Sequence, residues 1–358
     1  MKVLIAAGGT GGHIYPGIAV AKEIMRRKET NEVLFVGTAK GLEVRIVPEN
    51  GFQLSLIDSA GLKSVGLVGK LKGLAVLPKS FMEARQLIRQ FRPHVVVGAG
   101  GYVSGPVLLM AAIMGIPTLV MDSNALPGFT NRSLSRFIDK AALTFDDAMP
   151  YFGKKGVVVG NPVRKEFFEV EKKQRSDDFH VLIFGGSQGS RAINYAIADA
   201  LEHLADSADK LKIVHQTGEA DLEAIREKYE GSAFPNADVR PFISDMFAEF
   251  AKADLVISRA GATTCAEIAA AGKASIMVPL PTAADDHQRK NAEAMQRVGA
   301  TKVVLQAEMS GEVLAKDIKA LLNDPDKITA MESAAKEMAR DDAAERVVDL
   351  IEELRRNV

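Results

Sequence analysis

Residues 3–13 read VLIAAGGTGGH, and residues 180–190 read HVLIFGGSQGS. In both stretches a short apolar run ends in a glycine-rich segment, and an amphipathic segment follows. These following segments are His13–Arg27, with Pro16 near the predicted helix start, and Arg191–Leu204. Proline suits a first helical turn, and a strand that leads through a tight loop into a helix is the repeating unit of parallel α/β sheets. The same unit therefore occurs in each half of the chain.

Further apolar runs alternate with helical segments along the whole sequence. The predicted strands are 3–7, 32–37, 95–97 and 118–121 in the first half, and 180–184, 212–216, 239–241, 255–258 and 275–278 in the second. Alternating strands and helices favour parallel sheets with right-handed crossovers. A chain of 358 residues is too long for one ordinary core. We predict an α/β fold of two Rossmann-like, doubly wound parallel-sheet domains that face a cleft.

A glycine–proline segment, GNPVR at 160–164, precedes a charged run at 166–175 and marks the expected linker. The predicted domains are residues 1–161 and 162–340. Residues 327–358 have helical periodicity. The last part, 341–358, is expected either to pack back on the first domain or to form a simple surface helix.

Residues 95–121 contain no charged side chain, and this length could span a membrane. Seven glycines and prolines interrupt the stretch, however, so we interpret it as a strand, a glycine loop, a helix at 106–114 and a second strand. The chain has a single cysteine, Cys265, which rules out an intramolecular disulfide and suits a reducing cytoplasm.

The net charge of −1 hides an asymmetry between the two halves. Residues 1–162 hold 19 lysine and arginine residues against 11 acidic ones, a net of +8, whereas the remainder holds 26 against 35, a net of −9. Residues 63–92 combine seven basic residues with an apolar series and one acid, Glu83. This pattern is typical of a surface that binds anionic lipid, and also of an amphipathic core helix with a basic solvent face. Nucleic acid is not among the expected partners.

Three strand-to-helix junctions are rich in glycine: Gly8–Gly12, Gly98–Gly105 and Gly185–Gly189. Glycine lets the backbone approach a phosphate closely, and the following helix offers unpaired N–H groups. A nicotinamide-binding domain also needs an acidic residue at the end of the second strand. The corresponding strands end in Gly37-Thr38 and Gln216-Thr217, which argues against a dehydrogenase, and no P-loop motif is present.

Several side chains near these junctions are candidates for chemistry. His13 is suited either to remove a proton from an attacking hydroxyl or to cap its helix. Glu267 is suited either to hold a ribose diol or to stabilise a helix dipole. Asp285, Asp286 and His287 have no second cluster of ligands, so no metal and no cofactor are expected. The charge of a leaving diphosphate would be met by helix N-termini, backbone N–H groups and Arg164.

At the level of motifs the chain resembles the MurG family of glycosyltransferases. The segments that carry the resemblance are GGTGGH at 8–13, GAGGYVSGP at 98–106, NPVR at 161–164, GGSQGSRAIN at 185–194, AGATTCAEIAAAGK at 260–273 and the HQ-x-x-N pattern at 287–291. The resemblance covers essentially the whole chain. It implies the two-domain GT-B fold and metal-independent, inverting transfer of N-acetylglucosamine from its UDP form to the lipid-linked muramyl-pentapeptide, lipid I, giving lipid II for peptidoglycan.

The resemblance also assigns roles to residues. The donor is expected in the C-terminal half, with Ser187 at a phosphate, Ile243 at the uracil, Glu267 at the ribose and Gln288 at the sugar hydroxyls. Other family positions at the diphosphate or the donor edge are Thr10, Gly11, Gly12, Asn124, Arg164, Ala262, Thr263, Thr264, Cys265 and Ala266. The loops at 8–13 and 98–105 are expected to form the acceptor side and to receive the lipid diphosphate, with Gly100, Gly101 and Tyr102 in the second loop and His13 as the candidate base.

The family acts as a peripheral enzyme on the cytoplasmic face of the plasma membrane, so residues 63–92 are expected to meet an anionic membrane surface. Other functions stay open from the residues alone: a GT-B transferase with another lipid acceptor, a UDP-N-acetylglucosamine 2-epimerase, and a non-enzymatic module that binds nucleotide sugars. A lipid acceptor explains the basic apolar segment, whereas an epimerase does not need one.

Overall fold

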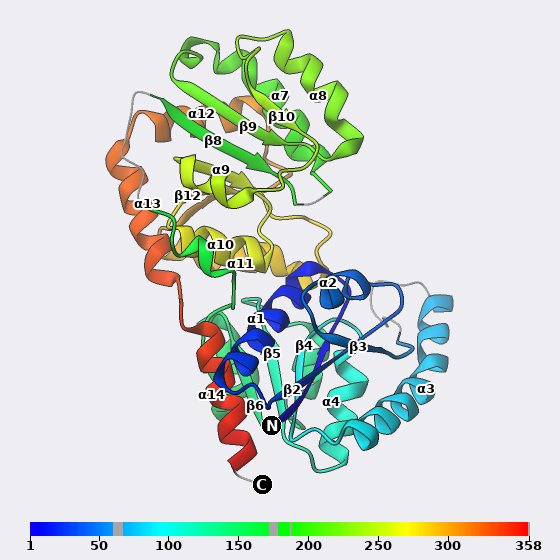
Figure 1. The fold of residues 1–358 in the computed structure, drawn as a ribbon. Helices are drawn as coiled ribbons and strands as arrows, with labels where there is room; N and C mark the ends of the chain where they lie inside the picture. Colours follow the sequence, from blue (N-terminus) through cyan, green and yellow to red (C-terminus); the bar gives the residue numbers. More distant parts are fainter. Residues whose placement is uncertain (60–66, 172–177, 187, 357–358) are drawn as a thin grey trace. The chain divides into compact units, whose positions relative to one another are not determined.

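The computed structural model describes residues 1–59, 67–171, 178–186 and 188–356, and for residues 67–76 it describes the backbone alone. The chain divides into two units (Figure 1). Unit 1 consists of Met1–Val163 with Arg340–Val358, and unit 2 of Arg164–Ala339. These limits lie within two residues of the predicted domain limits, and the C-terminal segment belongs to unit 1.

Unit 1 is built on a parallel sheet that has seven strands within the described residues. In spatial order the strands are β3 (Gln53–Leu56), β2 (Glu32–Gly37), β1 (Lys2–Ala7), β4 (Val95–Gly100), β5 (Thr118–Asp122), β6 (Lys140–Leu143) and β7 (Gly156–Val158). The helices of the unit are α1 (Gly11–Arg27), α2 (Glu43–Glu49), α3 (Leu67–Phe91), α4 (Ser104–Ile113), α5 (Phe129–Leu134), α6 (Met149–Phe152) and α14 (Ala343–Arg356).

The central strand β1 shows why this sheet is covered on both faces. Successive side chains of a strand point to opposite faces. Val3 and Ile5 belong to one core with residues of α1 and α14, whereas Leu4 and Ala6 belong to a second core with residues of α3 and α4. A strand buried on both faces is apolar throughout, which is why residues 3–7 were recognisable from sequence.

Unit 2 repeats this architecture with a six-stranded parallel sheet in the part of the chain that the structure describes. The strand order is β10 (Asp238–Arg240), β9 (Leu211–Gln216), β8 (Phe179–Phe184), β11 (Leu255–Ser258), β12 (Ala274–Met277) and β13 (Thr301–Val303). Its helices are α7 (Arg191–His203), α8 (Leu222–Glu230), α9 (Met246–Lys252), α10 (Ala262–Ala271), α11 (His287–Arg297), α12 (Gly311–Leu322) and α13 (Pro325–Met338). The prediction of two doubly wound parallel sheets is confirmed.

The structure corrects the predicted start of the first helix. The helix α1 begins at Gly11, so Pro16 lies inside it and His13 occupies its first turn. The strands β3, β6, β7 and β13 are not among the predicted strands. These strands have only three or four residues, and β3 and β13 carry exposed positions, so their patterns are too short to stand out.

The uncharged stretch 95–121 forms β4, α4 and β5, as predicted. Among the described residues, no helix combines the length and the apolar character that crossing a membrane requires. The predicted C-terminal helical segment is in fact two helices, α13 in unit 2 and α14 in unit 1, and residues 339–342 separate them.

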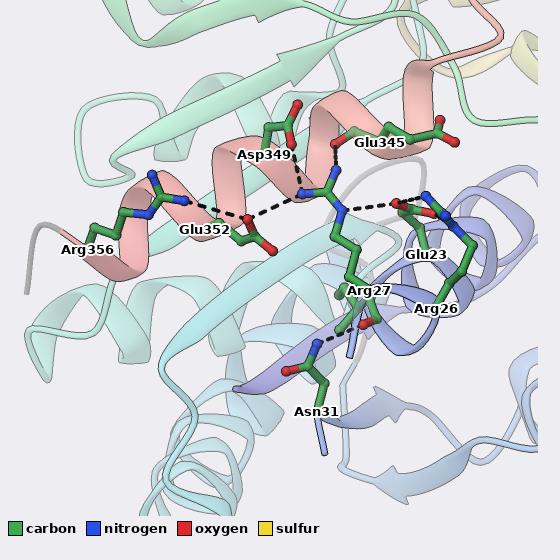
Figure 2. A network of polar contacts seen from close by, with 9 residues as sticks. Glu23, Arg26, Arg27, Asn31, Glu345, Asp349, Glu352 and Arg356 are labelled. Atoms are coloured by element: carbon green, nitrogen blue, oxygen red, sulfur yellow. Dashed lines mark hydrogen bonds and ion pairs between the residues drawn. The ribbon is translucent and has the colours of Figure 1, made fainter. Parts of the chain in front are cut away.

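The helix α14 packs against α1 through an apolar face and a polar network. Val347, Val348, Ile351 and Leu354 lie in the core beside α1. Figure 2 shows Arg27 of α1 reaching between acidic groups of both helices. Its guanidinium contacts Asp349 at 2.7 Å and Glu352 at 3.3 Å, and donates to the carbonyl of Glu345 at 2.8 Å.

The same arginine neutralises a buried acid on its own helix. Nε of Arg27 lies 2.9 Å from Oε1 of Glu23, whose side chain is only 5% exposed. Arg26 also pairs with Glu23 at 2.6 Å, but its own side chain is 65% exposed. Burial alone would lower the pKa of Arg27, but its acidic partners outweigh this effect and hold the pKa above its ordinary value. Arg27 therefore joins the last helix of the chain to the first.

Replacing Arg27 by alanine is expected to lower the free energy of unfolding of the protein by about 2 kcal/mol, because several hydrogen bonds to charged groups are lost in a partly buried place. Urea denaturation measures the change. The matched control is Arg26→Ala, which removes an exposed partner of the same Glu23 and should cost clearly less. Equal losses for the two variants would contradict a special role of Arg27 in docking α14.

Candidate active site

The order of the strands in each sheet sets the place of the candidate site. Consecutive connections run outward in opposite directions from the β1/β4 pair in unit 1 and from the β8/β11 pair in unit 2. At such a switch point the connections after the two strands lead away in opposite directions, and ligands bind outside the carboxyl ends of the strands. In unit 1 these loops contain Gly8–Thr10 and Gly101–Val103, and in unit 2 they contain Gly185–Ser190 and Arg259–Gly261. The predicted glycine-rich junctions thus lie at both switch points.

In unit 1 the two switch-point loops touch backbone to backbone. The N–H of Gly8 donates to the carbonyl of Gly100 at 3.2 Å. Gly101 has a φ of +83°, and a Cβ there would lie 2.3 Å from the carbonyl oxygen of Gly8. Ser104, at the start of α4, accepts from the N–H of Gly100 and lies 2.9 Å from the carbonyl oxygen of Ala6. Only glycine fits at position 101.

His13 lies where these two loops meet. It occupies the first turn of α1, is half-buried, and its N–H donates to the carbonyl of Thr10 at 3.1 Å. Gly100 has a φ of +124°, and a Cβ there would lie 2.2 Å from Nδ1 of His13. The imidazole therefore occupies the space that the missing side chain of Gly100 leaves.

The N-terminus of α1 lies next to His13. Thr10 is the N-cap residue, and it is exposed. Within the described residues its side chain makes no capping hydrogen bond. Because the first N–H groups of a helix have no partner inside the helix, those of Gly11 and Gly12 remain available to an anion. Tyr102, which is 58% exposed, follows in the β4–α4 loop, and its carbonyl accepts from the hydroxyl of Ser59 at 3.0 Å.

Asn124 lies in the loop after β5, which a buried carboxyl shapes. Asp122 accepts from the N–H of Asn124 at 3.0 Å, from the N–H of Gly128 at 3.0 Å and from Nδ2 of Asn131 at 2.8 Å. Burial raises the pKa of Asp122, while these hydrogen bonds oppose the increase. The backbone of Asn124 is thereby fixed within unit 1.

In unit 2 an amide fixes the glycine loop. Gln216, buried at the end of β9, donates from Nε2 to the carbonyl of Gly186 at 2.8 Å and accepts at Oε1 from the N–H of Ile243 at 2.7 Å. The predicted phosphate residue Ser187 lies outside the described residues. Gln216 therefore joins the loop predicted for the phosphates to the residue predicted for the uracil.

A network of buried hydrogen bonds lies beside the β8–α7 loop. Nδ2 of Asn194 donates to the carbonyl of Thr217 and to Asp221, both at 2.9 Å. Oδ1 of Asn194 lies 3.1 Å from Nε2 of His215, and Nδ1 of His215 lies 3.1 Å from the hydroxyl of Tyr229. The amide oxygen only accepts, so Nε2 carries the proton and Nδ1 accepts from the tyrosine. Burial lowers the pKa of His215 to about 3, so the ring is neutral.

The other switch-point loop of unit 2 leads into α10, which carries six of the predicted site residues. Ala262, Thr263, Thr264 and Ala266 are half-buried near its N-terminus, where Gly261 is the N-cap. Among the described atoms, Oγ1 of Thr263 is buried without a hydrogen-bond partner. Cys265 is buried, and burial raises the pKa of its thiol to about 12, which agrees with the prediction of a packing residue rather than a nucleophile.

Glu267 is held against Arg164. Nη2 of Arg164 lies 3.4 Å from Oε1 of Glu267, and its guanidinium also lies over the ring of Phe167. Burial raises the pKa of Glu267 to about 7, although the charge of Arg164 lowers it. The carboxyl group of Glu267 therefore titrates close to neutral pH.

Gln288 lies one residue inside α11, which follows β12 across the loop 278–286. Its Oε1 accepts from the N–H of Leu280 at 3.0 Å, so Nε2 keeps its hydrogen atoms for another partner. Asp285 and Asp286 in the same loop adopt left-handed backbone angles, with φ of +57° and +56°.

The comparisons with known proteins agree with this arrangement. The model of the glycosyltransferase family 28 N-terminal domain matches residues 3–143, and that of the family 28 C-terminal domain matches residues 180–347. A protein of Geobacter sulfurreducens named UDP-N-acetylglucosamine–N-acetylmuramyl-(pentapeptide) pyrophosphoryl-undecaprenol N-acetylglucosamine transferase is 46% identical over 98% of this chain and 97% of its own length. The crystal structure of Acinetobacter baumannii MurG is 34% identical, covers 98% of this chain and 99% of its own, and superposes with a TM-score of 0.82.

This chain belongs to the MurG family of glycosyltransferases. A UDP-N-acetylglucosamine 2-epimerase of Neisseria meningitidis, bound to UDP-GlcNAc, has a TM-score of 0.70 but is only 14% identical, so this likeness shows the fold alone. The prediction of a MurG-family transferase is confirmed, and the epimerase alternative is not favoured.

The structure brings the predicted residues together in two groups, each within its own unit. His13, Thr10–Gly12 and Gly100–Tyr102 meet at the switch point of unit 1, whereas α10, Arg164 and Gln288 belong to unit 2. Three residues that were not predicted hold the glycine loops: Glu43 accepts from the N–H of Gly9, Ser104 accepts from the N–H of Gly100, and Gln216 donates to the carbonyl of Gly186. For Gln216 a signal is present in the sequence, because it is a polar side chain at the end of a buried strand.

His215 makes the stability of unit 2 depend on acid. Its pKa is about 3 in the folded chain and near 6.5 when unfolded, so only the unfolded state binds the proton between these values. The contribution of His215 to the free energy of unfolding is fully present above pH 6.5. It falls by roughly 1.4 kcal/mol for each pH unit below that value. His215→Gln is expected to be less stable at pH 7 but to show a shallower loss towards pH 4.5 in urea denaturation. The same substitution at exposed His203 should leave the slope unchanged, and an unaltered slope in His215→Gln would count against this account.

Proposed function

We propose that this protein transfers N-acetylglucosamine from UDP-N-acetylglucosamine to the 4-hydroxyl of the muramyl sugar of lipid I, giving lipid II for peptidoglycan synthesis and cell wall growth. The observation that carries the proposal is the 46% identity, over nearly the whole of both chains, with a transferase named for this donor and acceptor. The second support is physical. Each unit has a glycine-rich switch point suited to phosphate, as expected for two ligands that both contain a diphosphate.

The donor is assigned to unit 2. The β8–α7 loop with Ser187 and the N-terminus of α10 with Ala262–Ala266 are suited to the diphosphate. The backbone of Ile243, fixed by Gln216, is suited to the uracil ring, and Glu267 to the two ribose hydroxyls. Nε2 of Gln288 is assigned to the hydroxyls of the N-acetylglucosamine. Arg164 keeps further N–H donors for the leaving diphosphate, because one of its nitrogens alone approaches Glu267.

The acceptor is assigned to unit 1. The N–H groups of Gly11 and Gly12 and the dipole of α1 are suited to the lipid diphosphate, next to Gly100, Gly101 and Tyr102. Thr10 and Asn124 are assigned to the donor edge of this region. His13 is assigned as the base, since its ring lies beside the same loops.

The proposed reaction is a single displacement with inversion. The muramyl oxygen bonds to the anomeric carbon as the bond between that carbon and the UDP oxygen breaks, and the hydroxyl proton passes to His13. The departing charge stays on the UDP diphosphate, where helix N-termini, backbone N–H groups and Arg164 stabilise it. These groups provide the positive potential that a metal supplies in other transferases, so the proposal includes no metal and no cofactor.

The lipid acceptor calls for contact with a membrane, and we place the protein peripherally on its cytoplasmic side, with α3 as the proposed contact. Of the predicted segment 63–92, residues 63–66 lie outside the described residues, and for 67–76 only the backbone is described. In the remainder Ala84 and Ile88 face the core, whereas Lys79, Arg85, Arg89 and Arg92 are exposed. This basic outer face supports contact with anionic lipid.

The decisive test is release of UDP from UDP-N-acetylglucosamine in the presence and absence of a lipid I analogue. We expect UDP release that depends on the acceptor and a disaccharide product. Release without any acceptor, or transfer to diacylglycerol but not to the analogue, would contradict the proposed function.

His13→Gln is expected to lower kcat by 100-fold or more while binding of UDP stays unchanged, because the loss of a general base costs about 10²–10⁴-fold. Gly100→Ala should lower kcat in the same direction, since the added methyl group displaces the imidazole. Gly128→Ala is the matched control, because its φ of −58° is ordinary and a Cβ there meets nothing. Near wild-type kcat in His13→Gln would remove His13 as the base.

The titration of Glu267 predicts a pH dependence for the donor. A carboxylate accepts hydrogen bonds from both ribose hydroxyls, and protonation removes part of this capacity. With a pKa of about 7, the KM for UDP-N-acetylglucosamine should rise about tenfold from pH 8 to pH 6. Arg164→Met removes the charge that lowers this pKa, so the rise should begin at higher pH. Glu267→Gln should show a high KM without this dependence, and a flat wild-type profile would exclude the ribose assignment.

A further inference from the structure

A completely buried carboxyl group lies under the β1–α1 glycine loop of unit 1. Glu43 is the first residue of α2 and is 0% exposed. Its Oε2 accepts from the N–H of Gly9 at 2.9 Å, and its Oε1 accepts from the N–H of Thr38 at 2.8 Å and from the hydroxyl of Thr38 at 3.0 Å. A buried acid is costly unless hydrogen bonds satisfy it, and here all three donors come from the two loops beside it.

The fold makes room for this carboxyl with glycine at three positions. A Cβ at Gly8 would lie 2.8 Å from Oε1 of Glu43, one at Gly37 would lie 2.4 Å from its Cγ, and one at Gly41 would lie 1.8 Å from Oε2. Side chains at these places would displace the carboxyl group. Gly37 and Gly41 therefore leave the space that the side chain of Glu43 occupies.

Gly9 is held from both sides as a result. Its N–H donates to Glu43, and its carbonyl accepts from the N–H of Leu42 at 3.4 Å. The φ of Gly9 is +89°, a conformation that needs to be held because glycine adopts many others. The β2–α2 loop thus acts as a clamp on the peptide of Gly9.

A series of contacts connects Gly9 to the candidate base, His13. Gly8, the neighbour of Gly9, donates to the carbonyl of Gly100, and the ring of His13 packs on Gly100. A change in Gly9 therefore reaches His13 through one peptide bond, one hydrogen bond and one van der Waals contact.

In dinucleotide-binding domains an acid near the end of the second strand holds the ribose of the ligand. Glu43 comes after the second strand of unit 1 but binds the protein's own loop. We propose that Glu43 is a positioning residue for the acceptor: it occupies the N–H of Gly9, leaves the N–H groups of Gly11 and Gly12 to the lipid diphosphate, and fixes the loop against which His13 is placed. This inference rests on the proposed function, in which unit 1 binds the acceptor.

Glu43→Gln is the sharpest test because it preserves size. The two donors of Thr38 keep the amide oxygen on their side, so the amide N–H₂ faces the N–H of Gly9 and the loop contact is lost. We expect kcat/KM for a lipid I analogue to fall tenfold or more, with the KM for UDP-N-acetylglucosamine and the Kd of UDP within twofold of wild type. A role in stability alone would not separate acceptor from donor in this way.

Thr38→Val is the matched control. It removes the hydroxyl donor to Oε1 but retains the contact between Glu43 and Gly9, so both substrates should keep their constants within twofold. Glu43→Asp is the second variant, for use if the glutamine variant does not fold. It keeps the carboxylate but is too short to reach both loops, and it should show the same selective loss towards the acceptor.

The outcomes separate the inference from the function on which it rests. If the wild-type enzyme fails to transfer sugar to the lipid I analogue, the proposed function fails. If wild type transfers sugar but Glu43→Gln and Glu43→Asp leave acceptor kinetics unchanged, or weaken donor and acceptor equally, the positioning role of Glu43 is overturned.

Discussion

Close contact between backbone loops is the constraint on which both candidate sites depend. In unit 1 the loops after β1 and β4 approach so closely that Gly101 has no room for a Cβ beside Gly8. In unit 2 the β8–α7 loop meets the end of β9 in the same way, where a Cβ at Gly189 would lie 1.8 Å from the carbonyl oxygen of Thr217. Phosphate recognition by backbone N–H groups requires such exposed main chain. Glycine loses more conformational entropy on folding than other residues, so these loops need further groups to fix them.

The two units solve this problem with different buried side chains. Unit 1 uses the carboxyl of Glu43, which accepts three hydrogen bonds, whereas unit 2 uses the amide of Gln216, which both donates and accepts. Asn194 and neutral His215 then fix the turn at Thr217 beneath the second loop. The amide and the neutral ring add no charge of their own beneath the loop that is proposed to receive a nucleotide diphosphate. The buried side chains of Glu43, Gln216 and Asn194 are all hydrogen-bonded, as burial requires.

The return of the C-terminus to unit 1 has a physical consequence of its own. The chain passes from unit 1 to unit 2 near Val163–Arg164 and back near Ala339–Arg340, so two connections join the units. Gly160, with a φ of +91°, lies directly against Arg340, where a Cβ would be 2.6 Å away. The apolar face of α14 and the Arg27 network then hold the returning segment on α1 (Figure 2). Docking of α14 therefore adds to the stability of unit 1 although it is distant in sequence.

The sequence by itself determined the fold class and the family. The apolar runs 3–7 and 181–184 are buried on both faces and therefore lack polar alternation. The glycine junctions mark the point in each sheet from which the strand order runs outward in opposite directions. It also indicated His13, Arg164 and Glu267 as candidates, because local motifs carry them. Only the tertiary structure decided that α1 begins before His13, that the last helical segment is broken at 339–342, and that Gly100 leaves the space for the imidazole. The roles of Glu43 and Gln216 also arise from contacts between loops far apart in sequence, which no local pattern encodes.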